Sequence, residues 1–450
     1  MPPDERTLEN LLFNLLKSGA LNLDEGTKAV LRAPCGVVSD RGLPDGMEPH
    51  EPNCRHFDPA SPEYGDDEFI ITQLPPATAA EASTVCMVSG RMARIIVNTP
   101  DIGTAVPRPT PSTYCIKEAP GKGLGMYATR DIRAGELIVA ERPLLIVPVS
   151  MYARRPYPST VTKEQGLQVM MADTEREYEV MLEKMAPANR AAYMALANSH
   201  RFDGSGPILG VIRTNGFGDE CMVDSGLGLS NETGGFSIIC NDMSRMNHDC
   251  AHNTTRYFDM PSFSMQARAI RDIKIGDEIT TNYCHTLEPF ATRHEILARY
   301  DVKCTCALCT NPSESDPLLA QCDIVHGRAP PNFEKRNRAW FTDFSVPNST
   351  DVKPLLSDLV AHIKTGQEAS GGYAFTLFEL MKTYAARGDI KNTRAYARKY
   401  AVWQLATNGK VITDQQIESA FGMTAVAEVV LRLRGKTKAK MANRTVKASK

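Results

Sequence analysis

The chain has 450 residues, of which 42% are hydrophobic and 23% are charged, and its formal net charge at pH 7 is −2. This composition is typical of a globular protein with two or three domains. The small net charge argues neither for nor against a nucleic-acid partner. No apolar run approaches the roughly 20 residues that a membrane-spanning helix needs, so we expect no membrane association.

The first 111 residues are expected to form an N-terminal extension that is partly disordered. A helix is predicted over Leu8–Ser18, where Gly19 would end it. Ala33–Tyr64 is rich in Pro, Gly and Asp, which favours a loop or disorder. Two strands are predicted afterwards, over Glu68–Leu74 and Val85–Val97.

Residues 112–300 are predicted to form one β-rich domain of short strands with a helical and loop insert over 150–236. Strands are expected within Tyr114–Pro148 and at Thr255–Asp259, Phe263–Ile270 and Glu278–Tyr283. The insert is expected to be helical over 164–200, because apolar residues recur there at spacings of three and four. Gly204–Gly235 is glycine-rich and is interpreted as an irregular loop. A short helix is predicted to begin near Thr292.

Two segments of this domain echo each other. Arg130–Ile138 reads RDIRAGELI and Arg271–Ile279 reads RDIKIGDEI. Both indicate a strand end, a glycine turn and a new strand. Because no third copy occurs, the echo indicates one domain interrupted by the insert and not a solenoid.

Residues 313–434 are predicted to form a helical C-terminal domain, with helices over 354–363, 373–387, 390–405 and 417–433. The break at Gly388-Asp389 predicts an antiparallel helical hairpin, either in a tetratricopeptide-like arrangement or in a plain bundle. The tail, residues 435–450, is basic and is expected to be disordered. Nuclear localisation or nucleic-acid contact is the alternative interpretation of this tail.

Cysteine spacing gives the strongest chemical signal. Cys304, Cys306 and Cys309 lie within six residues, in the segment 301–312, and Cys250 is a candidate fourth ligand. Four thiolates would form a closed tetrahedral zinc site, which is structural. The twelve cysteines of the chain are therefore interpreted as reduced thiols with one metal site, as in a nuclear or cytoplasmic protein.

Three further motifs stand around this cluster. Gly121–Gly125 carries three alternating glycines, for which a dinucleotide loop and a plain β-turn are the alternatives. Asn247 and His248 lie three and two residues before Cys250. The alternative role for such a pair is structural, because these side chains often form hydrogen bonds with buried backbone groups. Tyr283 ends a predicted strand, and Tyr300 ends the last short helix. Core packing is the alternative role for both tyrosines.

In this order, the glycine segment, Asn247–Cys250, Gly276–Tyr283 and the cysteine cluster resemble SET-domain protein lysine methyltransferases. The resemblance is closest to the SET-and-MYND branch and its fungal relatives, over about 112–312 and the helical C-terminal domain. It implies an α+β fold in which short strands surround a pseudo-knot, followed by a zinc-binding post-SET segment. The MYND zinc finger is expected to be missing, because 148–237 contains only Cys221.

The resemblance also implies the site residues. Tyr283 and Tyr300 would be catalytic and would border the channel for the substrate lysine. S-adenosylmethionine would contact Lys122, Gly123, Leu124, Asn215, Asn247, His248 and Tyr283. Zinc on Cys250, Cys304, Cys306 and Cys309 would hold the post-SET segment over that channel.

The implied function is S-adenosylmethionine-dependent methylation of a lysine in a histone or another protein, by a monomer. Asp249, His252 and Val302 depart from the pattern of the family, where serine, proline and phenylalanine are usual. These departures support the alternative of a catalytically weak SET-like interaction module. A third interpretation is methylation of a small molecule or of a side chain other than lysine.

Overall fold

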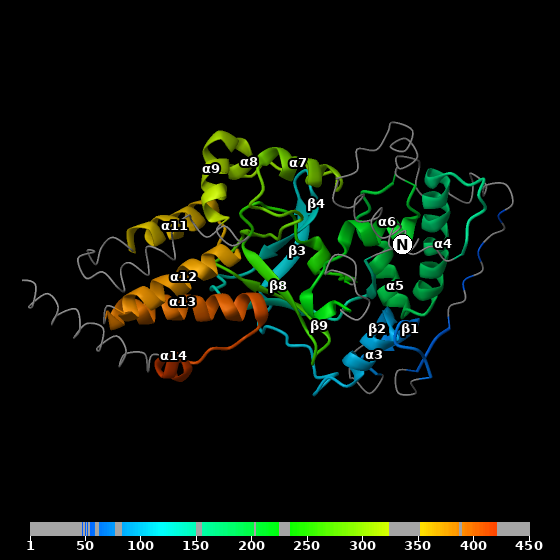
Figure 1. The fold of residues 1–450 in the computed structure, drawn as a ribbon, viewed down its shortest axis with the longest axis horizontal. Helices are drawn as coiled ribbons and strands as arrows, with labels where there is room; N and C mark the ends of the chain where they lie inside the picture. The colour runs from blue at the N-terminus through cyan, green and yellow to red at the C-terminus, as the bar shows by residue number, and fades with distance from the viewer. Residues whose placement is uncertain are drawn as a thin grey trace, which may run out of the picture.

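The computed structural model describes residues 47, 50, 52, 55–58, 63–76, 83–149, 155–201, 204–224, 235–323, 352–386 and 389–420. The strands lie in the middle of an elongated molecule, with helices gathered toward both ends (Figure 1). The predicted helix over Leu8–Ser18, the basic tail 435–450 and most of the predicted loop Ala33–Tyr64 lie outside the described residues. No described helix is both long and apolar enough to cross a bilayer.

Three small sheets form the β-rich part of an α+β fold, as predicted. The first contains, in spatial order, β1 (Phe69–Leu74), β2 (Thr84–Ser89), β6 (Leu145–Pro148) and β7 (Phe236–Ile239). The second contains β10 (Glu278–Ile279), β4 (Gly123–Ala128) and β3 (Tyr114–Ala119). The third contains β5 (Leu137–Glu141), β9 (Ser264–Ala269) and β8 (Thr254–Asp259). All neighbouring pairs are antiparallel except β2 and β6.

The insert packs helices on one side of the first sheet. These helices are α4 (Lys163–Glu183) and α5 (Pro187–Met194), which confirm the predicted helical stretch, and α6 (Pro207–Asn215). Tyr193 is fully buried there and its hydroxyl donates to the Ile208 carbonyl at 2.8 Å. On the other side the first sheet shares a core with the strands that carry Met126 and Phe258. One apolar interior therefore fixes the sheets relative to one another.

The predicted strand over Val85–Val97 is wrong in its second half. β2 ends at Ser89, and α3 (Gly90–Val97) follows it. The Ser89 hydroxyl accepts the Met92 N–H at 3.0 Å and caps the helix. Met92 and Ile96 then recur at helical spacing and are buried.

The predicted irregular loop over Gly204–Gly235 is also corrected, because it contains α6 and a 3₁₀ turn over Glu220–Met222. Pro207 occupies the first turn of α6, where its missing N–H costs no hydrogen bond. The Glu175 carboxylate of α4 accepts the N–H groups of Ile208 and Leu209, both at 2.7 Å. The cap comes from a residue 33 positions earlier, which a local sequence pattern does not reveal.

The predicted strand over Glu278–Tyr283 is shorter than expected, because β10 ends at Ile279. The Thr280 N–H donates to the Asn253 side chain at 2.9 Å and leaves the ladder. Thr281 then pairs in parallel with the segment around His248, through hydrogen bonds to Asn247 and Asp249. Immediately before Tyr283, the backbone thus leaves β4 and pairs with the segment around His248.

The two echoing segments pair with each other across the domain. Ile132 and Ile273 exchange both backbone hydrogen bonds, each at 2.9 Å. The Asp131 carboxylate accepts the Ile275 N–H at 3.0 Å, and the Asp272 carboxylate accepts the Ala134 N–H at 2.9 Å. The echo is thus a reciprocal contact between the segments before and after the insert, and the single interrupted domain stays a prediction.

Helices dominate the remainder of the described chain. In chain order they are the 3₁₀ turn Met243–Arg245, α7 (Phe290–Ala298), α8 (Ala307–Thr310), α9 (Pro312–Cys322), α11 (Val352–Thr365), α12 (Gly371–Ala386), α13 (Ile390–Asn408) and α14 (Asp414–Ala420). Beyond Ala420 the last predicted helix lies outside the described residues.

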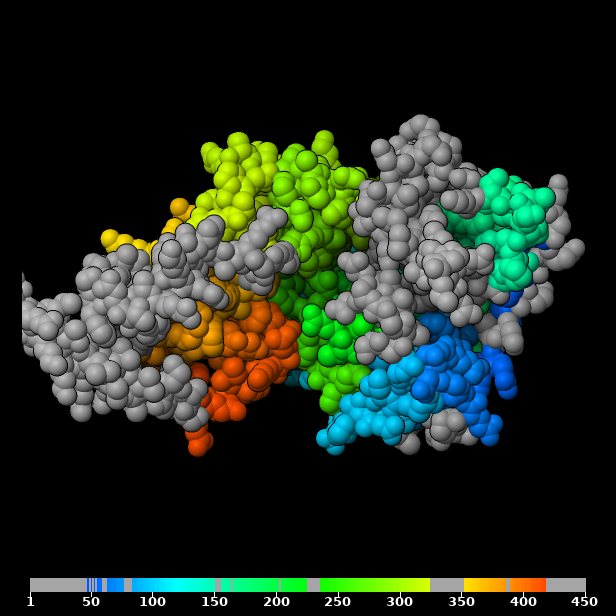
Figure 2. Space-filling view, in the orientation of Figure 1, coloured from blue at the N-terminus to red at the C-terminus, as the bar shows by residue number. Residues whose placement is uncertain are grey.

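The predicted hairpin is confirmed for α12 and α13. Tyr384 stacks on Tyr396 near the connection, and Phe378 meets Tyr400 one turn farther away, which is the order of an antiparallel pair. α13 also packs on the third sheet, where the Thr255 hydroxyl donates to the Ala406 carbonyl at 2.8 Å. Figure 2 shows these helices, in orange, beside the green central strands.

Candidate active site and metal centre

The glycine segment and the segment Asn247–Cys250 meet at the edge of the second sheet. The Asn247 amide nitrogen donates to the Leu124 carbonyl at 3.0 Å and to Glu278 at 2.8 Å. The other Glu278 oxygen accepts the Lys122 ammonium at 2.8 Å. A Cβ on Gly125 would lie 3.1 Å from the Asn247 amide, so the missing side chain allows this approach.

His248 links the cysteine cluster to Tyr283. Its Nδ1 lies 3.0 Å from the Tyr283 backbone nitrogen, which donates to it, and its Nε2 lies 3.3 Å from the Cys250 Sγ. Because Nδ1 accepts, the ring proton belongs on Nε2 and points at the sulfur. Removal from water lowers the pKa of His248 to about 4, which keeps the ring neutral.

The two predicted channel tyrosines lie side by side. The ring centroids of Tyr283 and Tyr300 are 5.5 Å apart and their planes are inclined by 52°. The Tyr283 hydroxyl donates to the Met246 carbonyl at 2.9 Å. Burial raises the pKa of Tyr283 to about 12, and it also raises the pKa of Tyr300. Both phenols therefore keep their protons at neutral pH.

Arg256 supplies a positive charge near this tyrosine pair. Its Nη1 donates to the side chains of Thr281 at 2.7 Å and Asn282 at 3.0 Å, directly before Tyr283. The guanidinium also lies over the Phe217 ring, 4.9 Å from its centroid. Desolvation lowers the pKa of Arg256, and the charge of Arg256 opposes the rise in the pKa of Tyr283.

The four predicted metal ligands come together although 54 residues separate Cys250 from Cys304. The sulfurs of Cys250, Cys304, Cys306 and Cys309 all lie within 4.8 Å of one another. Cys250 Sγ is 4.0 Å from Cys304 Sγ and 3.5 Å from Cys309 Sγ. Tetrahedral zinc with Zn–S bonds of about 2.3 Å places sulfurs about 3.8 Å apart. The spacing therefore fits a zinc ion.

The surroundings of the cluster also fit a metal bound by four thiolates. Such a centre carries two negative charges. The Arg293 side chain is fully buried, and its Nη2 lies 3.8 Å from the Cys309 Sγ, to which it donates. Leu308 and Leu319 pack against the cluster, in which Cys250 and Cys309 are buried and Cys304 and Cys306 are half-buried. Every ligand position is occupied by cysteine, so the centre is built for structure and not for catalysis.

A family model matches the part of the chain that holds most of this arrangement. The SET domain family matches residues 123–284, which contain the glycine segment from Gly123 onward, Asn247–Cys250 and Tyr283. The chain contains a SET domain. The strands from β4 to β10 lie within the matched range, and so does the insert.

Several curated proteins resemble the part of the chain that holds the SET domain. "Histone-lysine N-methyltransferase set5" of Schizosaccharomyces pombe is 28% identical over 198 residues, which cover 44% of this chain and 50% of that protein. "N-lysine methyltransferase SMYD2-B" of Danio rerio is 34% identical over 103 residues, which cover 23% of this chain and 21% of that protein. The chain thus spans half of the first relative and a fifth of the second.

A solved structure, "Crystal structure of the SET domain of LSMT bound to Lysine and AdoHcy", also matches. Its sequence identity is 14% and its TM-score is 0.25, over 71% of this chain and 88% of that chain.

Asn215 lies at the C-terminal end of α6, within the insert of the SET domain. Its amide nitrogen donates to the carbonyls of Ala197 at 2.7 Å and Val211 at 2.8 Å. Among the described residues, no hydrogen bond joins Asn215 to Lys122 or Asn247. Its role in cofactor binding stays a prediction.

Of the three residues that depart from the SET pattern, Asp249 and Val302 form local hydrogen bonds, whereas the buried Nδ1 of His252 has no hydrogen-bond partner among the described residues. The Asp249 carboxylate accepts the Ala251 N–H at 2.7 Å, and burial raises the pKa of Asp249. His252 is buried, and desolvation with nearby Arg271 and Arg256 lowers its pKa to about 3. The Val302 N–H donates to the Leu297 carbonyl at 3.1 Å.

Sequence reasoning did not single out Glu278, Arg256 or Arg293 as parts of the SET domain site. A signal existed for Glu278, because an acidic residue on the strand facing a Gly-Lys-Gly turn can pair with its lysine. Arg256 and Arg293 carry no local pattern that separates a buried arginine from an exposed one. Only the fold brings their charges to the tyrosine pair and to the thiol cluster.

Proposed function

We propose that the protein is an S-adenosylmethionine-dependent lysine N-methyltransferase that acts on a protein substrate, histone or not. The observation that carries the proposal is the position of His248, which contacts both Cys250 of the metal centre and the backbone of Tyr283. The SET domain match and the relatives named as lysine methyltransferases support it. We place this action in the nucleus or cytoplasm, which fits the cysteine pattern.

The proposed cofactor contacts lie around Glu278. The backbone of Lys122, Gly123 and Leu124 would cradle the cofactor, and Asn247 and His248 would bind it from the facing segment. When bound, S-adenosylmethionine supplies a methyl group on a positively charged sulfur. Asn247 is already oriented by Leu124 and Glu278, so little side-chain freedom is lost on binding.

Tyr283 would orient the substrate amine. Its hydroxyl hydrogen is donated to the Met246 carbonyl, which leaves oxygen lone pairs as acceptors for an amine N–H. Such an acceptor aligns the nitrogen for in-line displacement, where positioning supplies much of the acceleration. Tyr300 would form the neighbouring wall of the channel.

The lysine amine must be neutral to attack, although its ordinary pKa is about 10.4. Burial and nearby positive charge both favour the neutral amine. Arg256 contributes such a charge from beside Tyr283, because a guanidinium stays protonated in proteins. These effects together remove the need for a general base, and we assign none.

The decisive experiment compares Tyr283→Phe with Tyr257→Phe. Tyr257 is a matched control, because its hydroxyl also donates one hydrogen bond, to Gln266 at 2.8 Å. We expect Tyr283→Phe to slow methyl transfer to a peptide library at least tenfold, or about 1.4 kcal/mol in the barrier. Calorimetry should show cofactor affinity within about twofold of the parent protein, and Tyr257→Phe should transfer normally.

A folded, zinc-loaded protein that binds no S-adenosylmethionine would overturn the proposal. Binding without transfer to any peptide would favour the interaction module, for which Asp249, His252 and Val302 are the supporting residues. Mass spectrometry of the products separates lysine methylation from methylation of another side chain or of a small molecule.

A further inference from the structure

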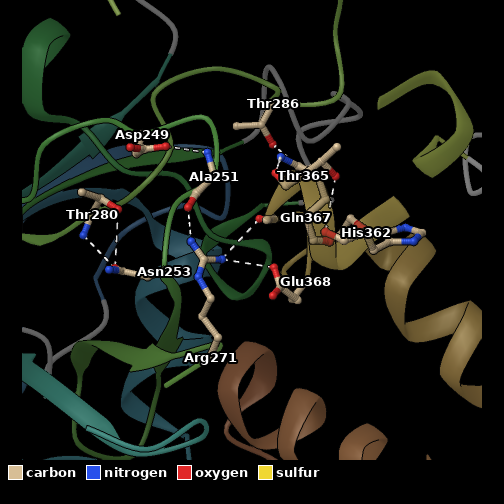
Figure 3. Close-up of polar contacts among 12 residues, drawn as sticks. Asp249, Ala251, Asn253, Arg271, Thr280, Thr286, His362, Thr365, Gln367 and Glu368 are labelled. Atoms are coloured by element: carbon tan, nitrogen blue, oxygen red, sulfur yellow. Dashed lines mark hydrogen bonds and ion pairs between the residues drawn. The ribbon is translucent and has the colours of Figure 1, made fainter. Parts of the chain in front are cut away.

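The loop between α11 and α12 reaches into the SET domain (Figure 3). Gln367, at 1% exposure, donates from its amide nitrogen to the Cys250 carbonyl at 2.8 Å. Its amide oxygen accepts the Thr286 hydroxyl at 2.7 Å. One buried side chain of the C-terminal helices therefore joins the segment that holds a metal ligand to the segment that follows Tyr283.

The orientation of this amide is fixed by its partners. The nitrogen of Gln367 lies near two carbonyl oxygens, those of Cys250 and Thr365, and the oxygen lies near a hydroxyl. A flipped amide would place oxygen against two oxygens that cannot donate. Glutamine can donate to the two carbonyls and accept from the hydroxyl. Glutamate would have no N–H to donate to the Cys250 carbonyl.

Arg271 and Gly366 reinforce the same junction. The Arg271 guanidinium donates to the carbonyls of Ala251 and Gly366 and pairs with Glu368 at 3.1 Å. Gly366 has φ +64°, and a Cβ there would lie 2.6 Å from the Cβ of Ala251. The loop therefore fits against the Cys250–Ala251 backbone without space for a side chain.

We propose that Gln367 is a positioning residue of the active site. Through it, the C-terminal helices fix the backbone at Cys250, which carries a metal ligand, and at Thr286, which follows Tyr283. This inference rests on the proposed function. Cys250 binds His248 through its sulfur and Gln367 through its carbonyl, so movement of its backbone shifts both contacts. Thr286 transmits the same restraint to the chain three residues beyond Tyr283.

Loss of the Gln367 amide would leave the buried Cys250 carbonyl and Thr286 hydroxyl without this partner. Such unpaired groups are costly where water cannot replace the missing partner. Groups that orient a metal ligand typically change metal affinity about 10- to 100-fold when removed. The effect should therefore appear in metal retention and cofactor affinity and not only in turnover.

The test uses Gln367→Met in the full chain, with Gln404→Met as the matched control. Gln404 lies on α13 and donates to the Tyr400 hydroxyl at 2.8 Å within the same helical region. We expect Gln367→Met to release zinc to a colorimetric chelator at least about tenfold faster. It should also weaken S-adenosylmethionine binding about tenfold, which is about 1.4 kcal/mol. Gln404→Met should change neither quantity by more than about twofold.

Circular dichroism before each measurement establishes that both variants are folded. If Gln367→Met retains parental zinc release and cofactor affinity, Gln367 has no positioning role and the inference is wrong. Should Gln367→Met not fold, Thr286→Val tests the same restraint from the other side, with the same two measurements deciding. Failure of the proposed function is distinct, because the unchanged protein itself would then bind no S-adenosylmethionine.

Discussion

Glu278 holds two of the proposed cofactor-binding side chains at once, one on each carboxylate oxygen. The Lys122 side chain is 45% exposed, so its ion pair with Glu278 contributes at most about 1 kcal/mol. The hydrogen bond to Asn247 has a different role, because it fixes which way the amide faces. The orientation of Asn247 should therefore matter more for the cofactor than the charge on Glu278.

This expectation separates two substitutions at one position. Glu278→Gln keeps an oxygen that accepts from Asn247 and removes the charge beside Lys122, so cofactor affinity should stay within about twofold. Glu278→Ala removes both contacts and should weaken binding about tenfold, or about 1.4 kcal/mol. Calorimetric titration with S-adenosylmethionine measures both. Equal losses in the two variants would show that the charge is what matters.

The two glycine turns of the echoing segments show how an element depends on its neighbours. Gly135 has φ +85° and Gly276 has φ +86°, so an alanine at either position is strained by about 1 to 2 kcal/mol. A Cβ on Gly276 meets no atom within 4 Å, whereas a Cβ on Gly135 would lie 3.3 Å from Val402 on α13. The two turns are alike in sequence and backbone but not in surroundings.

Gly276→Ala should therefore lower the free energy of unfolding by the strain alone. Gly135→Ala should cost about 1 kcal/mol more, because the added methyl group presses on α13. Urea unfolding of the two variants measures the difference directly. If both variants lose the same stability, α13 yields to the methyl group and its packing on the turn is loose.

The cap between α4 and α6 predicts a pH dependence. Burial raises the pKa of Glu175 to about 7, from an ordinary value of 4.5. The folded state then holds this proton where the unfolded chain has lost it. The contribution of Glu175 to stability is fully present below pH 4.5, decreases as pH rises to about 7, and is constant above that.

Glu175→Gln removes this titration and keeps one of the two oxygens that accept from Ile208 and Leu209, so the lost hydrogen bond adds a cost that does not depend on pH. The free energy of unfolding of the parent protein, minus that of Glu175→Gln, should therefore fall between pH 5 and pH 8, by at most about 3 kcal/mol. Urea titrations at several pH values measure it, and other titrating groups cancel in the difference. A difference that is constant or that rises with pH would contradict the raised pKa.

Elements were predictable from the sequence where their cause is local. The short strands around Gly135, the α12–α13 hairpin and the echo all follow from patterns within a few residues. α3 was mistaken for a strand because its cap, Ser89, completes an apolar β-like run. α6 was mistaken for a loop because its cap, Glu175, lies on another helix. A distant partner decided only the second case, because Ser89 caps α3 through Met92, three residues away.

The same distinction holds for the site. The glycine segment, Asn247, His248 and the cysteines carry recognisable spacing, and the structure gathers the four thiols as the spacing predicts. Gln367 carries none, because its contacts with Cys250 and Thr286 span 117 and 81 residues. Long-range contacts of single polar side chains are what the sequence cannot reveal.

For the molecule as a whole, Cys250 is a junction of three parts. Its sulfur belongs to the cluster with the post-SET cysteines, its neighbour His248 holds the backbone of Tyr283, and its carbonyl is bound by the C-terminal helices. A metal ion at the cluster therefore restrains all three parts together. Removal of the metal should therefore loosen segments that lie far apart along the chain.

We expect a chelator at neutral pH to cost several kcal/mol of stability, or on the order of 10 °C in Tm. Hydrogen exchange should accelerate in 247–253, 278–286 and 366–370, whereas α4, which contacts none of the four thiols, should keep its protection. Cys304→Ser should reproduce the effect without chelator. Cys221→Ser is the control, because that thiol is exposed and lies outside the cluster. Acceleration confined to the post-SET cysteines would show that the metal restrains only its own loop and that Cys250 transmits nothing.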